Sequence, residues 1–119
     1  MVGVILAVLD DLLFSSKIKN ASSQIGITVR YARTAADALA EMRKSVPALV
    51  IFDLDSQRTD PLATLAEMKK DSALATIPTL GFASHVHGDV INAARTAGMD
   101  EVLARSAFTL RLGDILRNV

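Results

Sequence analysis

Two aspartates, Asp53 and Asp55, end an apolar run in the string LVIFDLDSQRTD, which covers residues 49–60. The residues before Asp53 are typical of a buried strand, whereas ionised carboxylates avoid burial unless they are paired. A carboxylate at such a place can attack phosphorus as a nucleophile, and its oxygens are the hard ligands that Mg²⁺ prefers. The string therefore indicates a candidate site for phosphate chemistry, for metal binding, or for both.

Other polar residues also follow apolar runs. Asp10 and Asp11 end MVGVILAVLDD, Ser84 follows IPTLGFA, and Arg105 follows EVLA. The carboxyl ends of parallel strands meet at one edge of a sheet, and this edge is where ligands bind in open α/β sheets. We therefore expect these residues to lie close to Asp53.

The elements that would position these residues alternate between strands and helices. Strand-like runs are expected at residues 4–9, 27–31, 48–52, 77–82 and 101–104. Helical periodicity fills the segments between them. Such alternation produces right-handed βαβ units, so we predict a doubly wound α/β fold with a parallel sheet that helices cover on both faces.

Each of the last four expected helices has an apolar stripe at helical spacing. Thr34 and Asp37 form a capping box before the second helix, Asp60 is the expected N-cap of the third, and Gly98 ends the fourth. The first helix, expected at about 12–24, contains four serines of low helix propensity. The stripes are formed by Ala35, Ala38, Leu39 and Met42; by Leu62, Leu65 and Met68; by Val90, Ala93, Ala94 and Ala97; and by Leu112, Ile115, Leu116 and Val119.

The composition restricts the classes of function. The chain has 119 residues, which we expect to form one domain (1–119) without an output domain, and its 13 basic and 13 acidic residues balance. Because there is no basic stripe or polybasic cluster, no nucleic acid or membrane partner is expected. The chain has no cysteine, which excludes disulfides and is typical of a cytoplasmic protein. The N-terminal apolar run stops at Asp10, far short of a membrane span.

The string VIFDLDSQRT resembles the first motif of haloacid dehalogenase-type phosphatases, an apolar strand followed by Asp-x-Asp-Gly-Thr. The resemblance implies that Asp53 is the nucleophile and that Asp55 is the acid/base. However, Ser56 and Gln57 replace the glycine and the threonine of the motif, and the string lies on the third expected strand rather than the first. Hydrolysis of a generic phosphomonoester with Mg²⁺ would indicate this alternative.

The whole chain resembles response-regulator receiver domains. An acidic pair ends the first strand, Asp53 ends the third in PALVIFDL, IPTLGFASH is similar to the receiver fourth strand, and AGMDEVLARSAF to the region of the fifth. The resemblance implies a flavodoxin-like (βα)5 sandwich with strand order 2-1-3-4-5. It also implies that Asp53 is the phosphoacceptor and that Asp10, Asp11 and Asp53 bind Mg²⁺. Such a domain is not an enzyme. It acts with signalling proteins such as a histidine kinase or an output domain.

Several positions depart from the receiver pattern. Ala83 stands where receivers have the threonine or serine that contacts the phosphoryl group, and Ser84 comes one residue later, on the opposite side of the strand. Val102 replaces the aromatic residue that moves in the switch. Arg105 replaces a lysine, and Ser106 replaces the next residue, a proline, so we expect a trans peptide bond between them. We therefore expect an impaired switch, with a fully functional phosphoaspartate receiver as the alternative.

The roles of several residues stay open. Arg105 either points into solvent or pairs with Asp53 and holds the domain in one state. Asp10 is favoured over Asp11 as the main metal-side acid, and Asp11 alternatively caps the first helix. We expect the side chain of Asp55 to be idle, because receivers use the backbone carbonyl at this place.

His85 and His87 could together reach one metal ion, but a surface loop explains them equally well. The expected function is that of a regulatory, receiver-like domain in two-component or phosphorelay signalling that acts through protein–protein interaction. We expect a monomer or a weak homodimer that uses the face of the fourth helix, the fifth strand and the fifth helix, including parts of 92–98 and 110–117. The sequence identifies neither the partner nor whether the domain stands alone.

Overall fold

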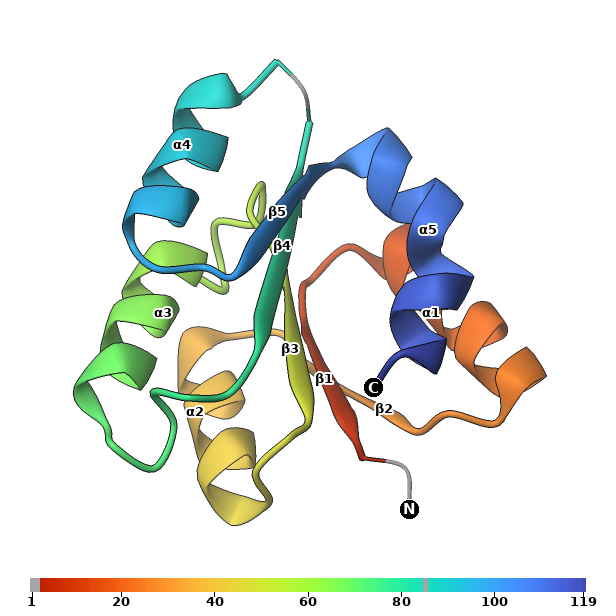
Figure 1. The fold of residues 1–119 in the computed structure, drawn as a ribbon, viewed down its shortest axis with the longest axis horizontal. Coiled ribbons are helices and arrows are strands. Elements are labelled where there is room, and N and C mark those ends of the chain that lie inside the picture. The colour runs from red at the N-terminus through yellow and green to blue at the C-terminus, as the bar shows by residue number, and fades with distance from the viewer. Residues whose placement is uncertain (1–2, 85) are drawn as a thin grey trace.

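The computed structural model describes residues 3–84 and 86–119. A parallel sheet of five strands lies between two layers of helices (Figure 1). The strand order is β2-β1-β3-β4-β5, and each neighbouring pair is parallel, which confirms the expected flavodoxin-like α/β fold. The elements are β1 (Ile5–Val8), α1 (Leu12–Ile25), β2 (Val29–Ala32), α2 (Ala35–Lys44), β3 (Leu49–Asp53), α3 (Pro61–Lys70), β4 (Thr79–Ala83), α4 (Gly88–Thr96), β5 (Glu101–Ala104) and α5 (Arg105–Arg117).

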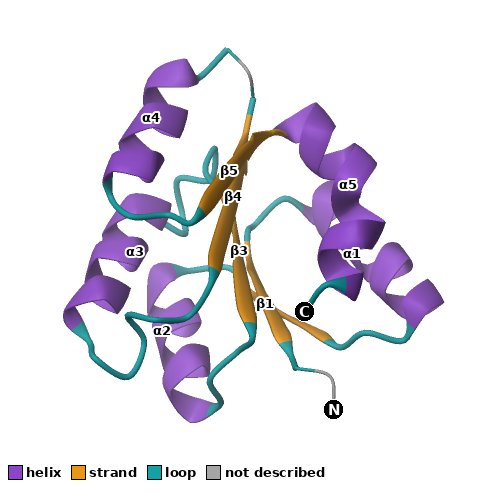
Figure 2. Ribbon diagram, viewed as in Figure 1, coloured by secondary structure: helices purple, strands orange, loops and turns teal. Residues whose placement is uncertain are grey.

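Different helices cover the two faces of the sheet. α1 and α5 lie on one face, and α2, α3 and α4 lie on the other (Figure 2). Side chains along a strand alternate between the faces. Val8 and Phe52 belong to the core beneath α2, α3 and α4, whereas Ile51 and Phe82 belong to the core beneath α1 and α5. Asp53 follows Ile51 by two residues, so its side chain emerges on the α1 and α5 side.

The ends of the helices follow the sequence in two cases and differ in one. The N–H of Asp37 donates to Thr34 Oγ1 over 3.1 Å at the start of α2, and Gly98 adopts a φ of 103° just beyond α4. Asp60 and Pro61 take the predicted N-cap and N1 positions of α3, but the capping hydrogen bond usual for an aspartate there is absent. The φ of Asp60, 40°, is left-handed. Side-chain capping requires an extended N-cap residue, and the loop before Pro61 does not provide one.

α1 forms over 14 residues despite its serines. The hydroxyl groups of Ser15 and Ser22 donate to backbone carbonyls within the helix or at its start. Phe14 and Ile18 are buried in the core beneath α1 and α5, so tertiary packing outweighs the low helix propensity. Neither α1 nor any other helix in the described part of the chain is long and apolar enough to span a membrane.

The apolar stripe predicted for α4 is only partly correct. Ala94 is fully buried, and Val90 and Ile91 pack against the same core. Ala93 and Ala97, however, are exposed. The main contacts of α4 with the sheet are to β4 and to the edge strand β5, so only a narrow line of the α4 surface is covered and Ala93 and Ala97 face solvent.

Candidate functional site

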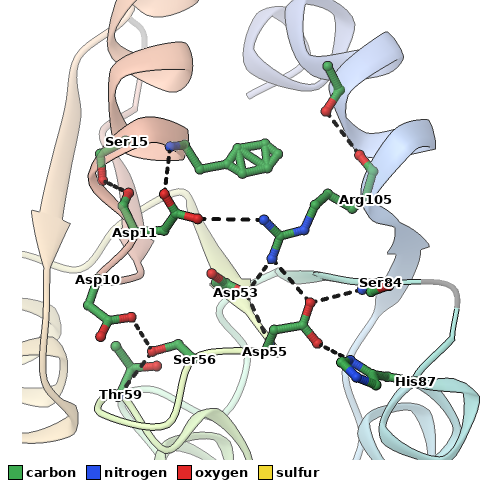
Figure 3. Close-up of polar contacts among 12 residues, drawn as sticks. Asp10, Asp11, Ser15, Asp53, Asp55, Ser56, Thr59, Ser84, His87 and Arg105 are labelled. Carbon is green, nitrogen blue, oxygen red and sulfur yellow. Dashed lines mark hydrogen bonds and ion pairs between the residues drawn. The ribbon is translucent and has the colours of Figure 1, made fainter.

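Polar side chains gather beyond the carboxyl ends of the strands, as a parallel sheet requires. Asp53 is the last residue of β3 and pairs in register with Phe82 of β4. Asp11 directly precedes α1, and Arg105 begins α5 directly after β5. Together with Asp55 from the loop after β3, Asp11, Asp53 and Arg105 form a cluster that we call the acidic site (Figure 3).

Asp53 is the buried carboxylate of the acidic site, with 3% of its surface exposed. Its Oδ1 accepts a hydrogen bond of 2.9 Å from the N–H of Asp55 and one of 3.4 Å from Nη2 of Arg105. Burial raises the pKa of Asp53, and the charges of Asp55 and Asp11 add to this, while the Asp55 N–H and Arg105 act in the opposite direction. The ionised form of Asp53 is therefore disfavoured, and the contact with Arg105 partly offsets this penalty.

Arg105 points into the acidic site rather than into solvent. Its Nη2 lies 3.1 Å from Asp55 Oδ2 and 3.4 Å from Asp53 Oδ1, and its Nη1 lies 3.7 Å from Asp11 Oδ2. The alternative of a solvent-exposed Arg105 is therefore wrong, and the alternative of a pair with Asp53 is confirmed. One guanidinium group faces carboxylates from three segments of the chain.

Two features hold Arg105 in this position. β5 continues into α5 without a loop, so Ser106 lies inside the helix, and there is no cis peptide bond among the described residues. The guanidinium carbon also lies 4.9 Å from the ring centroid of Phe14 and 5.4 Å from that of Phe82. These rings form an apolar floor with Phe108, which stacks on Phe82 at a centroid distance of 4.4 Å. Cation–π attraction therefore adds to the ion pairs.

The side chain of Asp55 is not idle, so that prediction is wrong. Its Oδ2 accepts a hydrogen bond of 2.9 Å from the N–H of Ser84 as well as the contact with Arg105, and its Oδ1 lies 2.7 Å from Nδ1 of His87. Burial acts to raise the pKa of Asp55, but the bonds from Ser84, His87 and Arg105 outweigh it and lower the pKa. Asp55 is thus the ionised carboxylate that connects the acidic site to the end of β4 and to the residue before α4.

Sequence reasoning named Asp55 and His87 but missed the contact between their side chains and the contact of Asp55 with Arg105, although one signal was present. Side chains two residues apart in extended chain lie on the same side. The spacing of Asp53 and Asp55 is therefore consistent with both carboxylates reaching one group. The partner of His87 depends on the path of two loops, and no local pattern specifies that path.

Asp10 and Asp11 have separate roles. Asp10 Oδ1 accepts a hydrogen bond of 2.8 Å from the hydroxyl group of Ser56, which ties the loop after β3 to the end of β1. Asp11 caps α1, since its Oδ1 accepts from the N–H of Phe14 over 3.0 Å, and its other oxygen faces Arg105. The alternative that Asp11 caps the helix is confirmed. It is also Asp11 rather than Asp10 that forms an ion pair with Arg105.

Of the three residues at the expected switch positions, Ala83 and Val102 are buried in the core and Ser84 reaches the acidic site only through its backbone. Ala83 ends β4 with no exposed surface, and Val102 of β5 is buried in the same core beneath α2, α3 and α4. Ser84 contacts the acidic site through its backbone N–H, which donates to Asp55. The side chains of Ala83 and Val102 thus contribute only packing.

The acidic site as arranged does not fit a Mg²⁺ ion. Magnesium requires near-octahedral oxygen ligands at about 2.0–2.1 Å. The oxygens of Asp11, Asp53 and Asp55 that face the site are instead directed at the guanidinium group, and Asp10 is bonded to Ser56. Within residues 3–84 and 86–119, no group of three or more histidine, cysteine or acidic side chains is placed to hold a metal ion. His85, part of the predicted histidine pair, lies outside the described residues.

Solved structures are similar to this chain over almost its entire length. The match to NtrX from Brucella abortus has 27% identity and a TM-score of 0.84, and it covers 99% of this chain but only 26% of NtrX. The receiver domain of NtrX, solved alone, matches with 25% identity and a TM-score of 0.82, over 96% of this chain and 95% of that domain. The chemotaxis response regulator CheY4 of Vibrio cholerae has 17% identity and a TM-score of 0.84, with 99% and 98% covered, and this similarity concerns the fold.

No protein-family profile and no curated protein sequence matches the chain. The strand order 2-1-3-4-5 and the similarity to the NtrX receiver nevertheless agree with each other. The chain spans about a quarter of NtrX, so the similarity concerns one domain of that longer protein. By its strand order and its structural neighbours, this chain has the flavodoxin-like fold of response-regulator receiver domains, and its similarity to NtrX supports a receiver domain.

Proposed function

We propose that this receiver domain regulates a two-component or phosphorelay pathway by binding other proteins rather than by catalysing a reaction. In this proposal Asp53 stands at the phosphoacceptor position, but the phosphorylation switch is impaired. The alternative is a receiver that is phosphorylated on Asp53 and switches fully. The two alternatives differ in whether Asp53 accepts a phosphoryl group.

The observation that carries the proposal is the pairing of Arg105 with Asp53. Phosphoryl transfer to a carboxylate needs a free attacking oxygen and a cation that neutralises the phosphoryl oxygens. Asp53 is almost completely buried, and its Oδ1 already accepts two hydrogen bonds, one of them from Arg105. An incoming phosphoryl group would have to displace Arg105 or crowd it against Asp11 and Asp55.

The residues at the switch positions support the same proposal. Ala83 has no hydroxyl group, so it cannot donate a hydrogen bond to a phosphoryl oxygen. A hydrogen bond to a charged group contributes about 1.5–3 kcal/mol, which the phosphorylated form would lack. Val102 is buried and carries no aromatic ring that could move between two positions.

The proposed binding surface is the face formed by α4, β5 and α5, and the proposed partner is a histidine kinase or an output domain. Ala93 of α4 and Ala97, the C-cap residue of this helix, are exposed and small, which permits close approach of another chain. Leu110 of α5 is 87% exposed, which is unusual for a large apolar side chain.

We expect the domain alone to be a monomer or a weak homodimer that associates through the same face. Sedimentation of the wild type across a range of concentrations measures this. A tight dimer that Leu110→Glu leaves intact would contradict the assigned surface. Leu12→Glu, which changes an exposed leucine on α1 instead, serves as the matched control.

Incubation with a small-molecule phosphodonor and Mg²⁺, followed by intact mass measurement, tests the proposed function. We expect the wild-type mass to remain unchanged, because Arg105 engages Asp53 and Ala83 offers no hydrogen bond. A stoichiometric gain of one phosphoryl group that disappears in Asp53→Asn would establish the fully functional receiver instead. Circular dichroism of each sample checks that an unmodified mass comes from folded protein.

A further inference from the structure

We propose that Arg105 is the built-in cation of the acidic site and that it keeps divalent metal ions out of this site while it is present. This inference rests on the proposed function, because both assume that Asp53 stands at the phosphorylation site of a receiver domain. It adds a physical reason for the proposed impaired switch, because a cation that belongs to the chain cannot dissociate.

The geometry around the guanidinium group is that of a filled cation site. Carboxylate oxygens of Asp11, Asp53 and Asp55 lie 3.7, 3.4 and 3.1 Å from its terminal nitrogens. A guanidinium group is a planar fork with several donors, and it can therefore serve several carboxylates at once. The three carboxylates come from the residue before α1, the end of β3 and the loop after β3.

The whole side chain of Arg105, and not only its guanidinium group, is held in place. Only 34% of the side chain is exposed, and the guanidinium carbon lies within 5.4 Å of the ring centroids of Phe14 and Phe82. The backbone of Arg105 is the first turn of α5, so it moves only if the helix moves. A side chain held by rings, ion pairs and a helix has little freedom to leave the site.

A metal ion would have to break further contacts to enter. Asp10, one of the acids that the receiver resemblance assigns to the metal, accepts a hydrogen bond from Ser56, and Asp11 caps α1. A dication beside the guanidinium group would also be repelled by it, and this repulsion is strong at partly buried sites. Binding of Mg²⁺ or Mn²⁺ therefore requires Arg105 to be displaced.

Asp55 extends the effect of this cation beyond the site. The same carboxylate that accepts from Arg105 also accepts from the N–H of Ser84 and contacts His87, the N-cap residue of α4. The first residue of α5, the end of β4 and the start of α4 are thus joined through one side chain (Figure 3). The position of α4 relative to α5 is then set by the chain itself.

Titration with Mn²⁺, with free Mn²⁺ counted by electron paramagnetic resonance, tests the inference without any phosphodonor. The variants are Arg105→Met, which keeps an apolar stem over Phe14 and Phe82, and Arg105→Met combined with Asp53→Asn. We expect Arg105→Met to bind Mn²⁺ about ten-fold more tightly than the wild type, a difference of about 1.4 kcal/mol. The combined variant should lose this gain, because Asp53 is one of the ligands.

Arg111→Met is the matched control, since it also removes a positive charge from α5 but breaks an exposed pair with Glu101. It should leave the affinity for Mn²⁺ unchanged. The inference is overturned if folded Arg105→Met gains no affinity over the wild type, or if Arg111→Met gains as much. An equal gain in both variants would mean that net charge, rather than the site, controls binding.

A second measurement needs only the wild type, in case Arg105→Met does not fold. Bound Mn²⁺ broadens the amide signals of nearby residues in nuclear magnetic resonance spectra. We expect no selective broadening at Asp53, Asp55 and Ser84 with one equivalent of Mn²⁺, and selective broadening there would overturn the inference. A wild type that binds Mn²⁺ but is not phosphorylated contradicts only this inference, whereas one that is phosphorylated contradicts the proposed function.

Discussion

Replacing Arg105 with methionine should lower the free energy of unfolding by about 2–3 kcal/mol at neutral pH. Removing one partner of a buried ion pair typically costs about 3–5 kcal/mol, because a charge is left buried without compensation. The side chain of Arg105 is 34% exposed, which reduces this value, but Asp53 would remain almost fully buried beside Asp11 and Asp55. Methionine keeps much of the contact with the aromatic rings, so the loss comes mainly from the missing charge.

The loss in Arg105→Met should depend on pH with a definite sign. Burial already raises the pKa of Asp53 above 3.8, and Arg105 acts to lower it, so without Arg105 the pKa rises further. A carboxyl group whose pKa is higher in the folded than in the unfolded state lowers the stability of the fold at high pH. This loss of stability disappears as the pH falls toward the pKa of the unfolded state. The difference between wild type and variant should therefore be larger at pH 8 than at pH 5.

Urea denaturation followed by far-ultraviolet circular dichroism measures both values. Arg111→Met is again the control, and because its ion pair with Glu101 is exposed we expect a change of less than about 1 kcal/mol. Losses of equal size at pH 5 and pH 8 in Arg105→Met would contradict the assigned role of Asp53. They would indicate that the arginine contributes through packing alone.

The fold could be predicted from the sequence because its signals are long and mutually consistent. The run that ends at Asp53 is apolar throughout, as a strand buried on both faces must be, and the strands bracket helices with clear apolar stripes. The position of Asp53 at the carboxyl end of β3 follows from the same pattern. The exposed Ala93 and Ala97 were mispredicted because helical spacing identifies an apolar side but not how much of it the sheet covers.

Only some residues of the acidic site could be predicted from the sequence, because the others are positioned by loops. Arg105 could be assigned to the site from its position after β5, but exposed arginine is the common case. Its inward direction depends on the rings of Phe14 and Phe82, which come together only in the folded core. Asp55 lies in an irregular loop, where Asp60 also has an unexpected left-handed backbone. Local sequence patterns do not determine such a path.

Asp55→Asn should be more damaging than Asp53→Asn, although position 53 is the proposed phosphoacceptor position. Asp55 receives hydrogen bonds at both oxygens, from Ser84 and Arg105 on one and from His87 on the other. Asparagine has one oxygen and one NH2 group, so at least one donor would face another donor. Because hydrogen bonds to charged groups contribute about 1.5–3 kcal/mol each, we expect Asp55→Asn to lower the free energy of unfolding by about 3 kcal/mol.

Asp53→Asn should be neutral or stabilising by about 1 kcal/mol, as is common when a buried charge is replaced by a neutral group that keeps its hydrogen bonds. The amide oxygen of asparagine can accept from both the Asp55 N–H and Arg105, and the penalty for burying an ionised group disappears. Urea denaturation of the wild type and both variants at neutral pH measures the order. A larger loss in Asp53→Asn than in Asp55→Asn would contradict the view that Asp55 holds the site together.

The two aspartates should also differ in how acid affects them. The pKa of Asp55 is lowered below 3.8 in the folded state, so its carboxylate stabilises the fold above that pH and loses this effect as the pH falls through the folded pKa. The difference between wild type and Asp55→Asn should therefore shrink in acid. The pKa of Asp53 is raised, so Asp53→Asn should gain stability over the wild type only where Asp53 ionises, at higher pH. Urea denaturation at several pH values measures these trends in the two variants. Opposite trends would identify Asp55 as the carboxylate that stabilises Arg105, and Asp53 as the buried carboxylate whose charge Arg105 partly compensates.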